Sequence, residues 1–245
     1  AVKTCTIFPG NTKAANINGA VTLYSDKDGT LQAILDFHLV TKWKTAADSL
    51  LAALRLARPD SQSILIIGAG TVAHNLVLSY GSGFPSAQFS VWNRTPERVD
   101  ALRLKYPEVA HAEDLETAVK TADIIVTATM SSTPILKGEW LRPGQHIDMI
   151  GAYREDMREG DDEMLRRARI FVDSYETALD HIGELKDPLA RGVISRDDVI
   201  ADYYGLESSR YQRTSDDEIT LFKNGGGAHL DLMTCRYMLD AYSTA

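Results

Sequence analysis

The sequence of 245 residues has little of what marks several protein classes. It contains two cysteines, Cys5 and Cys235, whose separation suits neither a disulfide framework nor a zinc site. With a net charge of −8, it has no basic excess of the kind that binds DNA or RNA. Its longest apolar runs, such as residues 64–67 and 124–126, have the length of strands rather than of bilayer-spanning helices. We therefore expect no metal, no nucleic acid partner and no membrane insertion.

The composition is that of a globular protein with a substantial core, since 44% of the residues are apolar and 24% are charged. No signal-peptide pattern occurs at the start, which favours a cytoplasmic location. The sequence begins directly in a strand-like segment, and we expect further residues to precede it.

Strands and helices alternate through the middle of the sequence. Such alternation indicates a parallel sheet with helices on both faces, and we predict a Rossmann-type doubly wound domain over residues 61–205. Its strands are expected at residues 64–67, 88–92, 124–128, 146–150 and 170–172. The charge-rich stretch 155–169 predicts a solvated helix with its approach loop.

Both ends of the sequence depart from this alternation. Residues 20–24 and 31–35 are expected to form a hairpin around Asp28-Gly29, followed by a mostly buried helix over residues 37–57. A strand at residues 219–222 and a helix at 228–242 close the sequence. We predict that residues 1–60 and 206–245 together form a smaller α+β domain.

The sequence Gly68-Ala-Gly70-Thr71-Val72-Ala73 follows an apolar strand directly and opens a helix. The first glycine permits a tight turn, the second lets the backbone approach a pyrophosphate, and the small Ala73 lets helix and strand pack closely. Free N–H groups at the helix start then receive the pyrophosphate. The context of strand and helix favours dinucleotide binding over an ordinary turn.

The end of the second strand usually distinguishes the two nicotinamide cofactors, because an acidic residue there holds the ribose of NAD. No acid stands there in this sequence, and the candidates for contacting the cofactor are Asn93, Arg94, Thr95 and Arg98. Thr95 precedes an expected helix whose free amides also suit a phosphate. These residues favour NADP(H) and leave NAD(H) possible, and the alternative is a surface arginine beside a capped helix.

Further cofactor contacts are expected at the carboxyl ends of later strands, where open α/β sheets bind ligands. The small residues at the end of the strand over 124–128 suit a cofactor that passes above them. The glycine cluster at 225–227 suits a close approach of the backbone, although an ordinary loop would also explain it. The residues concerned are Thr127, Ala128, Thr129, Met130, Gly151 and Gly226.

Several motifs together resemble the ornithine cyclodeaminase / mu-crystallin family. They are Lys3-Thr-Cys-Thr-Ile-Phe-Pro-Gly-Asn11, Trp43-Lys-Thr-Ala-Ala-Asp48, the Gly68 turn, Ile150-Gly-Ala-Tyr-Arg-Glu-Asp-Met-Arg-Glu159 and Thr220-Leu-Phe-Lys-Asn-Gly-Gly-Gly-Ala-His-Leu-Asp231. The resemblance implies a Rossmann domain, a substrate and dimerisation domain built from both chain ends, and a homodimer. It also implies an N-terminal segment ahead of Lys3 with an arginine that binds a carboxylate.

The family contains cyclodeaminases, dehydrogenases, imine reductases and a hormone-binding crystallin, so membership does not name the reaction. Cyclodeaminases have a catalytic aspartate where this sequence has Tyr153. The motifs are most similar to the branch that reduces Δ1-pyrroline-2-carboxylate to L-proline with NADPH. The alternatives are an NAD-dependent ornithine cyclodeaminase and a crystallin-like protein that binds NADPH and a small ligand.

The resemblance assigns Lys3 and Lys44 to the carboxylate of a small cyclic imino acid. Without it, Lys3 is equally well explained as a solvated lysine of an edge strand. Asp48 is predicted to orient Lys44, although the spacing i, i+4 also suits a simple helix ion pair. Tyr153 either donates a hydrogen bond to the substrate or packs at a strand end.

Overall fold

The computed structural model describes residues 1–8, 10–15 and 17–244. They form two compact units, one of Ala46–Gly226 and one that joins Ala1–Thr45 to Gly227–Ala245. These boundaries differ from the predicted ones, because residues 46–60 and 206–226 belong to the larger unit. No helix among the described residues is long and apolar enough to cross a membrane.

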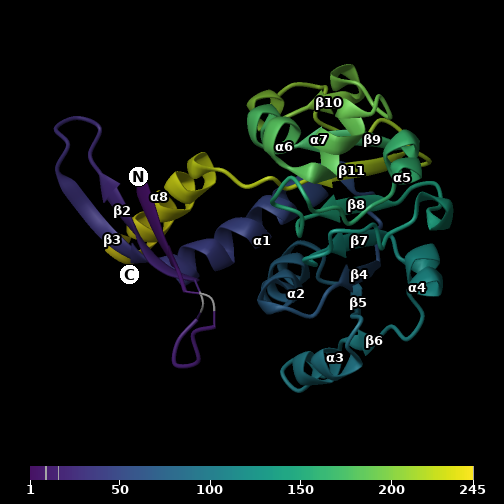
Figure 1. The fold of residues 1–245 in the computed structure, drawn as a ribbon, viewed down its shortest axis with the longest axis horizontal. Coiled ribbons are helices and arrows are strands. Elements are labelled where there is room, and N and C mark those ends of the chain that lie inside the picture. The colour runs from purple at the N-terminus through teal and green to yellow at the C-terminus, as the bar shows by residue number, and fades with distance from the viewer. Residues whose placement is uncertain (9, 16, 245) are drawn as a thin grey trace. The chain divides into compact units, whose positions relative to one another are not determined.

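The larger unit centres on an eight-stranded sheet in the order β10-β9-β11-β8-β7-β4-β5-β6 (Figure 1). All pairings among its described strands are parallel. The strand order reverses between β4 and β7, where sheets of this kind bind ligands at their carboxyl ends. The predicted Rossmann fold is therefore confirmed. The strands are β4 (Ser63–Ile67), β5 (Gln88–Trp92), β6 (Ala110–His111), β7 (Ile124–Thr127), β8 (His146–Met149), β9 (Ala168–Val172), β10 (Val199–Ala201) and β11 (Ile219–Lys223).

Helices bury both faces of this sheet. Along β4, Ile64 and Ile66 pack in a cluster with residues of α1, α2 and α3. Leu65 and Ile67 point the other way, into a cluster with residues of α4 to α7. Burial on both faces explains why the strands are continuous apolar runs. The helices are α1 (Phe37–Leu56), α2 (Thr71–Gly83), α3 (Pro96–Arg103), α4 (Leu115–Thr121), α5 (Asp162–Arg167), α6 (Tyr175–His181) and α7 (Gly183–Ala190), with short 3₁₀ turns η1 (Gly138–Trp140), η2 (Arg196–Asp198) and η3 (Tyr203–Gly205).

The smaller unit contains a three-stranded antiparallel sheet of β1 (Val2–Ile7), β2 (Ile17–Tyr24) and β3 (Leu31–Asp36), together with α8 (Ala228–Thr244). Val21 and Leu23 on one face are buried with Val40 and Cys235 of the helices. The predicted hairpin is confirmed, and Gly29 in its turn adopts a φ of +74°.

The opposite face of this small sheet carries exposed apolar side chains. Strand register aligns Val2 and Ile34 with Thr22 on this face, and Leu31 with Tyr24. Four apolar residues thus form an exposed apolar face, with exposed fractions from 41% for Tyr24 to 67% for Ile34. They are Val2, Tyr24, Leu31 and Ile34.

Two predictions about the fold were wrong. The strand near residue 220 was assigned to the smaller domain, but β11 lies between β8 and β9 of the large sheet and all its residues are buried. The stretch 155–169 is not simply a solvated helix. The helix α5 covers only Asp162–Arg167, and Glu159, which precedes this helix in the chain, is fully buried. Charged composition alone does not show which charged side chain points inward.

Candidate functional site

The glycine turn after β4 has the geometry expected of a pyrophosphate site. Gly68 adopts a φ of +114°, and a Cβ there would lie 2.7 Å from the carbonyl oxygen of Ala128. A Cβ at Gly70, the N-cap of α2, would meet no atom within 4 Å, so open space lies over the helix start. Thr71 and Val72 open α2, and Ala73 is fully buried against the sheet. This backbone can approach a phosphate closely.

Asn93, just beyond β5, connects the end of that strand to the glycine turn. Its Oδ1 accepts a hydrogen bond from the amide of Ala69 at 3.2 Å, and its Nδ2 donates to the carbonyl oxygen of Thr95 at 2.9 Å. Thr95 is the N-cap of α3, without a capping bond from its side chain. Within the part of the chain that the structure describes, the exposed guanidinium groups of Arg94 and Arg98 form no side-chain hydrogen bond or ion pair. They are available to an anionic ligand.

The residues at the end of β7 have different environments. Thr127 is fully buried, and its hydroxyl donates a hydrogen bond to Glu159 at 2.8 Å, so that hydroxyl is engaged within the protein. Ala128 and Thr129 are half-buried, whereas Met130 is exposed.

Gly151, after β8, approaches the β7 loop so closely that a Cβ would lie 1.9 Å from the carbonyl oxygen of Thr129. Only glycine fits at this position without moving the backbone. The ends of β7 and β8 are thus in tight contact beside the glycine turn.

The glycine cluster after β11 is held by a hydrogen bond to the carboxylate of Asp173. Gly226 adopts a φ of +67°, and its amide donates to Oδ2 of Asp173 at 2.6 Å. Burial raises the pKa of the Asp173 carboxyl. A contact between Gly226 and a cofactor stays a prediction.

In the smaller unit, Lys3 and Lys44 converge on the carboxylate of Asp231. The Lys3 ammonium lies 3.0 Å from Oδ1 of Asp231, and the Lys44 ammonium lies 3.4 Å from Oδ2. Lys3 also donates to the hydroxyl of Thr41 at 2.9 Å and lies 4.7 Å from the centre of the Phe37 ring. The two lysines that the family resemblance assigns to the substrate therefore lie at one place.

The positions of the two remaining candidates leave their roles open. Asp48 is buried in the larger unit, where its backbone carbonyl accepts a hydrogen bond from the Tyr203 hydroxyl at 2.7 Å. Its expected part in orienting Lys44 stays a prediction. Tyr153 is 54% exposed, and the guanidinium of Arg154 lies 5.5 Å from the centre of its ring.

Two acids that were not predicted from the sequence organise these regions. Asp231 is the partner of both lysines, and Glu159 accepts hydrogen bonds from the ends of β7 and β8. Both residues belong to the motifs that carried the family resemblance. Their position in those motifs was the available signal, since neither has a local pattern of its own.

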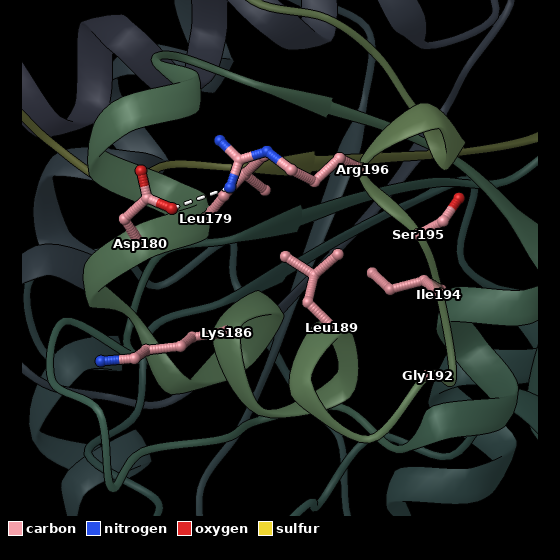
Figure 2. A pocket seen from close by; sticks show the side chains of 8 residues that line it. All are labelled: Leu179, Asp180, Lys186, Leu189, Gly192, Ile194, Ser195 and Arg196. Carbon is pink, nitrogen blue, oxygen red and sulfur yellow. Dashed lines mark hydrogen bonds and ion pairs between the residues drawn. The ribbon is translucent and has the colours of Figure 1, made fainter.

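A cavity of 560 Å³ lies beside α6, α7 and η2 (Figure 2). Arg196 in its lining pairs with Asp180 at 2.8 Å, and Lys186 pairs with Glu155 at 2.7 Å. None of the predicted site residues lines this cavity. We assign it no part in cofactor binding.

The profile of the "Ornithine cyclodeaminase/mu-crystallin family" matches residues 1–245. The chain belongs to this family. It is 49% identical over 244 residues to Delta(1)-pyrroline-2-carboxylate reductase of Paracoccus denitrificans, a match that covers 96% of this chain and 77% of that protein. It is 34% identical to ketimine reductase mu-crystallin of Mus musculus, over 99% of this chain and 76% of the mouse protein.

One solved structure is similar to this chain in both fold and sequence. Delta(1)-pyrroline-2-carboxylate reductase of Thermococcus litoralis, in complex with NADH and L-proline, superposes with a TM-score of 0.89 at 29% identity. The match covers 97% of this chain and 76% of that one.

Replacing Arg94 tests the prediction that the end of β5 contacts the extra phosphate of NADPH. We expect Arg94→Ala to weaken NADPH binding by about 1.5–3 kcal/mol, because a charge-assisted contact to the extra phosphate is lost. NADH binding should hardly change, and titration calorimetry with both cofactors measures the difference. Arg166→Ala, which removes an exposed arginine of α5, is the matched control. Equal losses for both cofactors would show that Arg94 supports the fold instead.

Proposed function

We propose that the chain reduces the C=N bond of a cyclic 2-imino acid with NADPH, most simply Δ1-pyrroline-2-carboxylate to L-proline. The coarser assignment, an oxidoreductase that acts on a CH–NH group with a nicotinamide cofactor, follows from its family and from the reductases that it resembles. The observation that carries the proposal is the convergence of Lys3 and Lys44 on Asp231.

The charges of this cluster match those of the proposed substrate. Two ammonium groups and one carboxylate leave a net positive charge, which suits the carboxylate of an imino acid. The three side chains are 82–91% buried, and an excess positive charge that is partly removed from water attracts an added anion more strongly than the same charge in water. Lys3 and Lys44 would hold the substrate carboxylate.

The reaction needs a hydride at the imine carbon and a proton at the imine nitrogen. NADPH, when bound, supplies the hydride. A protonated imine is the better hydride acceptor, and a carboxylate stabilises the cationic C=N–H group. Asp231, which pairs with both lysines, has the charge for that role.

The choice of NADPH rests on the end of β5. Asn93 stands where an acidic residue would hold the ribose of NAD, and its side chain is engaged with Ala69 and Thr95. The available guanidinium groups of Arg94 and Arg98 suit the additional phosphate of NADPH. The Thermococcus enzyme is described with NADH, so NADH remains the alternative.

Two other functions make different demands on the same residues. Ornithine cyclodeamination needs a carboxylate that moves protons between two hydride steps, and this chain has the phenol of Tyr153 at the position where cyclodeaminases have that aspartate. A crystallin-like protein would bind NADPH and a small ligand with little turnover. Turnover therefore separates the three functions.

We also propose that the chain pairs with a second copy through the exposed apolar face, namely Val2, Tyr24, Leu31 and Ile34. An apolar face on a three-stranded sheet is unfavourable in water and indicates an interface. Symmetric pairing of identical faces is the commonest assembly of soluble oligomers.

The Ile34→Glu variant tests this pairing, since a charge cannot be buried in an apolar interface without a large loss of affinity. Light scattering after gel filtration should give twice the chain mass for the wild type and a single chain mass for the variant. Leu104→Glu alters a leucine of the larger unit that is even more exposed than Ile34, and it should leave the dimer intact. A monomeric wild type would contradict the proposal.

Replacing Lys3 tests the substrate cluster. We expect Lys3→Ala to lower kcat/KM for the imino acid by at least about 100-fold, near 3 kcal/mol, because a cation that holds the substrate carboxylate is lost. NADPH affinity should stay within about twofold, since the ammonium groups lie in the smaller unit. Lys27→Ala, in the exposed turn between β2 and β3, is the control. A fully active Lys3→Ala enzyme would remove Lys3 from the site.

The reaction itself is tested by two assays on the wild-type protein. NADPH oxidation should be rapid with Δ1-pyrroline-2-carboxylate, and no proline should form from ornithine with NAD. A panel of larger cyclic imino acids then defines the ring size. Proline released from ornithine would establish the cyclodeaminase, and tight NADPH binding without turnover would establish the crystallin-like function.

A further inference from the structure

The fully buried Glu159 joins the carboxyl ends of β7 and β8. Its Oε2 accepts hydrogen bonds from the Thr127 hydroxyl at 2.8 Å and the Gly151 amide at 2.7 Å. Its Oε1 accepts from the amide and the hydroxyl of Thr129, both at 2.7 Å. One carboxylate thus fixes three positions that belong to two neighbouring strand ends.

The hydrogen bonds require an acceptor at both oxygens. Each oxygen faces one backbone amide, that of Thr129 or that of Gly151, and an amide can only donate. A hydroxyl can reverse its role, but a backbone N–H cannot. A carboxylate satisfies both amides, whereas a carboxamide would place its NH₂ group against one of them.

The position of Glu159 is itself determined by Glu184. The Glu184 carboxylate accepts from the amide of Glu159 at 2.7 Å and from that of Gly160 at 3.0 Å. Burial, with the nearby charge of Glu159, raises the pKa of Glu184 to about 7. The buried ammonium of Lys223 supplies opposite charge in the same region.

These strand ends lie where the second half of a dinucleotide would pass. The glycine turn after β4 would hold the pyrophosphate, and the end of β5 would hold the adenosine half. The other half then extends across β7 and β8, on the opposite side of β4 in the sheet. The Ala128 carbonyl, 2.7 Å from the Cβ that Gly68 lacks, connects the two regions.

We propose that Glu159 is a positioning residue that holds the ends of β7 and β8 in the shape required by the nicotinamide half of the cofactor. The inference rests on the proposed function, because it requires a nicotinamide cofactor. The carboxylate of Glu159 accepts hydrogen bonds from Thr127, Thr129 and Gly151, and none of these three residues belongs to the pyrophosphate turn or to the lysine cluster.

The Glu159→Gln variant tests this role through binding alone. We expect the dissociation constant of NADPH to rise about tenfold or more, the effect of disrupting hydrogen bonds to a charged group. The fragment 2′-phospho-ADP-ribose, which lacks nicotinamide, should bind within about twofold of wild type. NADH and ADP-ribose form a second pair for the same comparison.

Asp123→Asn is the matched control, because the Asp123 carboxylate also accepts hydrogen bonds from backbone amides, at the amino ends of the strands. Its Oδ2 accepts from the amides of Gln62 at 3.0 Å and Ser63 at 3.1 Å, beside the start of β7. This variant should lower the melting temperature without distinguishing dinucleotide from fragment. If Glu159→Gln fails to fold, Thr127→Val provides a second test. It removes one of the four hydrogen bonds to Glu159 and places no new donor against a backbone amide. NADPH binding should then weaken about threefold, with no change in the binding of the fragment.

Equal losses for dinucleotide and fragment, or no loss for either, would overturn the positioning role of Glu159. The same selective loss in Asp123→Asn would overturn it too, because general destabilisation would then explain the effect. The titrations contain no imino acid, so a protein that binds NADPH but turns over no substrate would contradict only the proposed function.

Discussion

The buried carboxylate of Glu159 determines how the carboxyl edge of the large sheet is built. Removing a carboxylate from water costs several kcal/mol unless hydrogen bonds and opposite charge compensate for it. Four short hydrogen bonds and the buried charge of Lys223 provide that compensation. The pKa of Glu184 is raised to about 7, so the Glu184 carboxyl is partly protonated near neutral pH. This limits the repulsion between Glu184 and Glu159.

The charged cluster of the smaller unit contains two cations and one anion, in contrast to the two acids at Glu159 and Glu184. Lys3 and Lys44 share the carboxylate of Asp231, and their side chains retain 18% and 14% of their exposure. Around Glu159 the carboxylate is fully buried and accepts four hydrogen bonds from protein groups. Around Asp231 a positive charge remains and water has access, so an anion can join the cluster. The first arrangement suits positioning and the second suits substrate recognition.

Features that depend on neighbours in the chain were predicted from the sequence. The turn from Gly68 to Ala73 and the hairpin around Gly29 follow from glycine geometry and apolar periodicity. Features that depend on distant residues were missed or wrong. The Lys3–Asp231 pair joins residues 228 positions apart, and β11 joins the large sheet after a long excursion of the chain.

The sequence by itself determined the Rossmann fold, the position of the glycine turn after β4 and, through its motifs, the family. Short segments specify these properties, because the periodicity of strands and helices and the conformational freedom of the glycine backbone extend over a few residues. Only the tertiary structure decided which charges are buried, which of them pair, and where the two units divide within α1. Burial and pairing are set by residues brought together across the whole chain, and no local pattern specifies them.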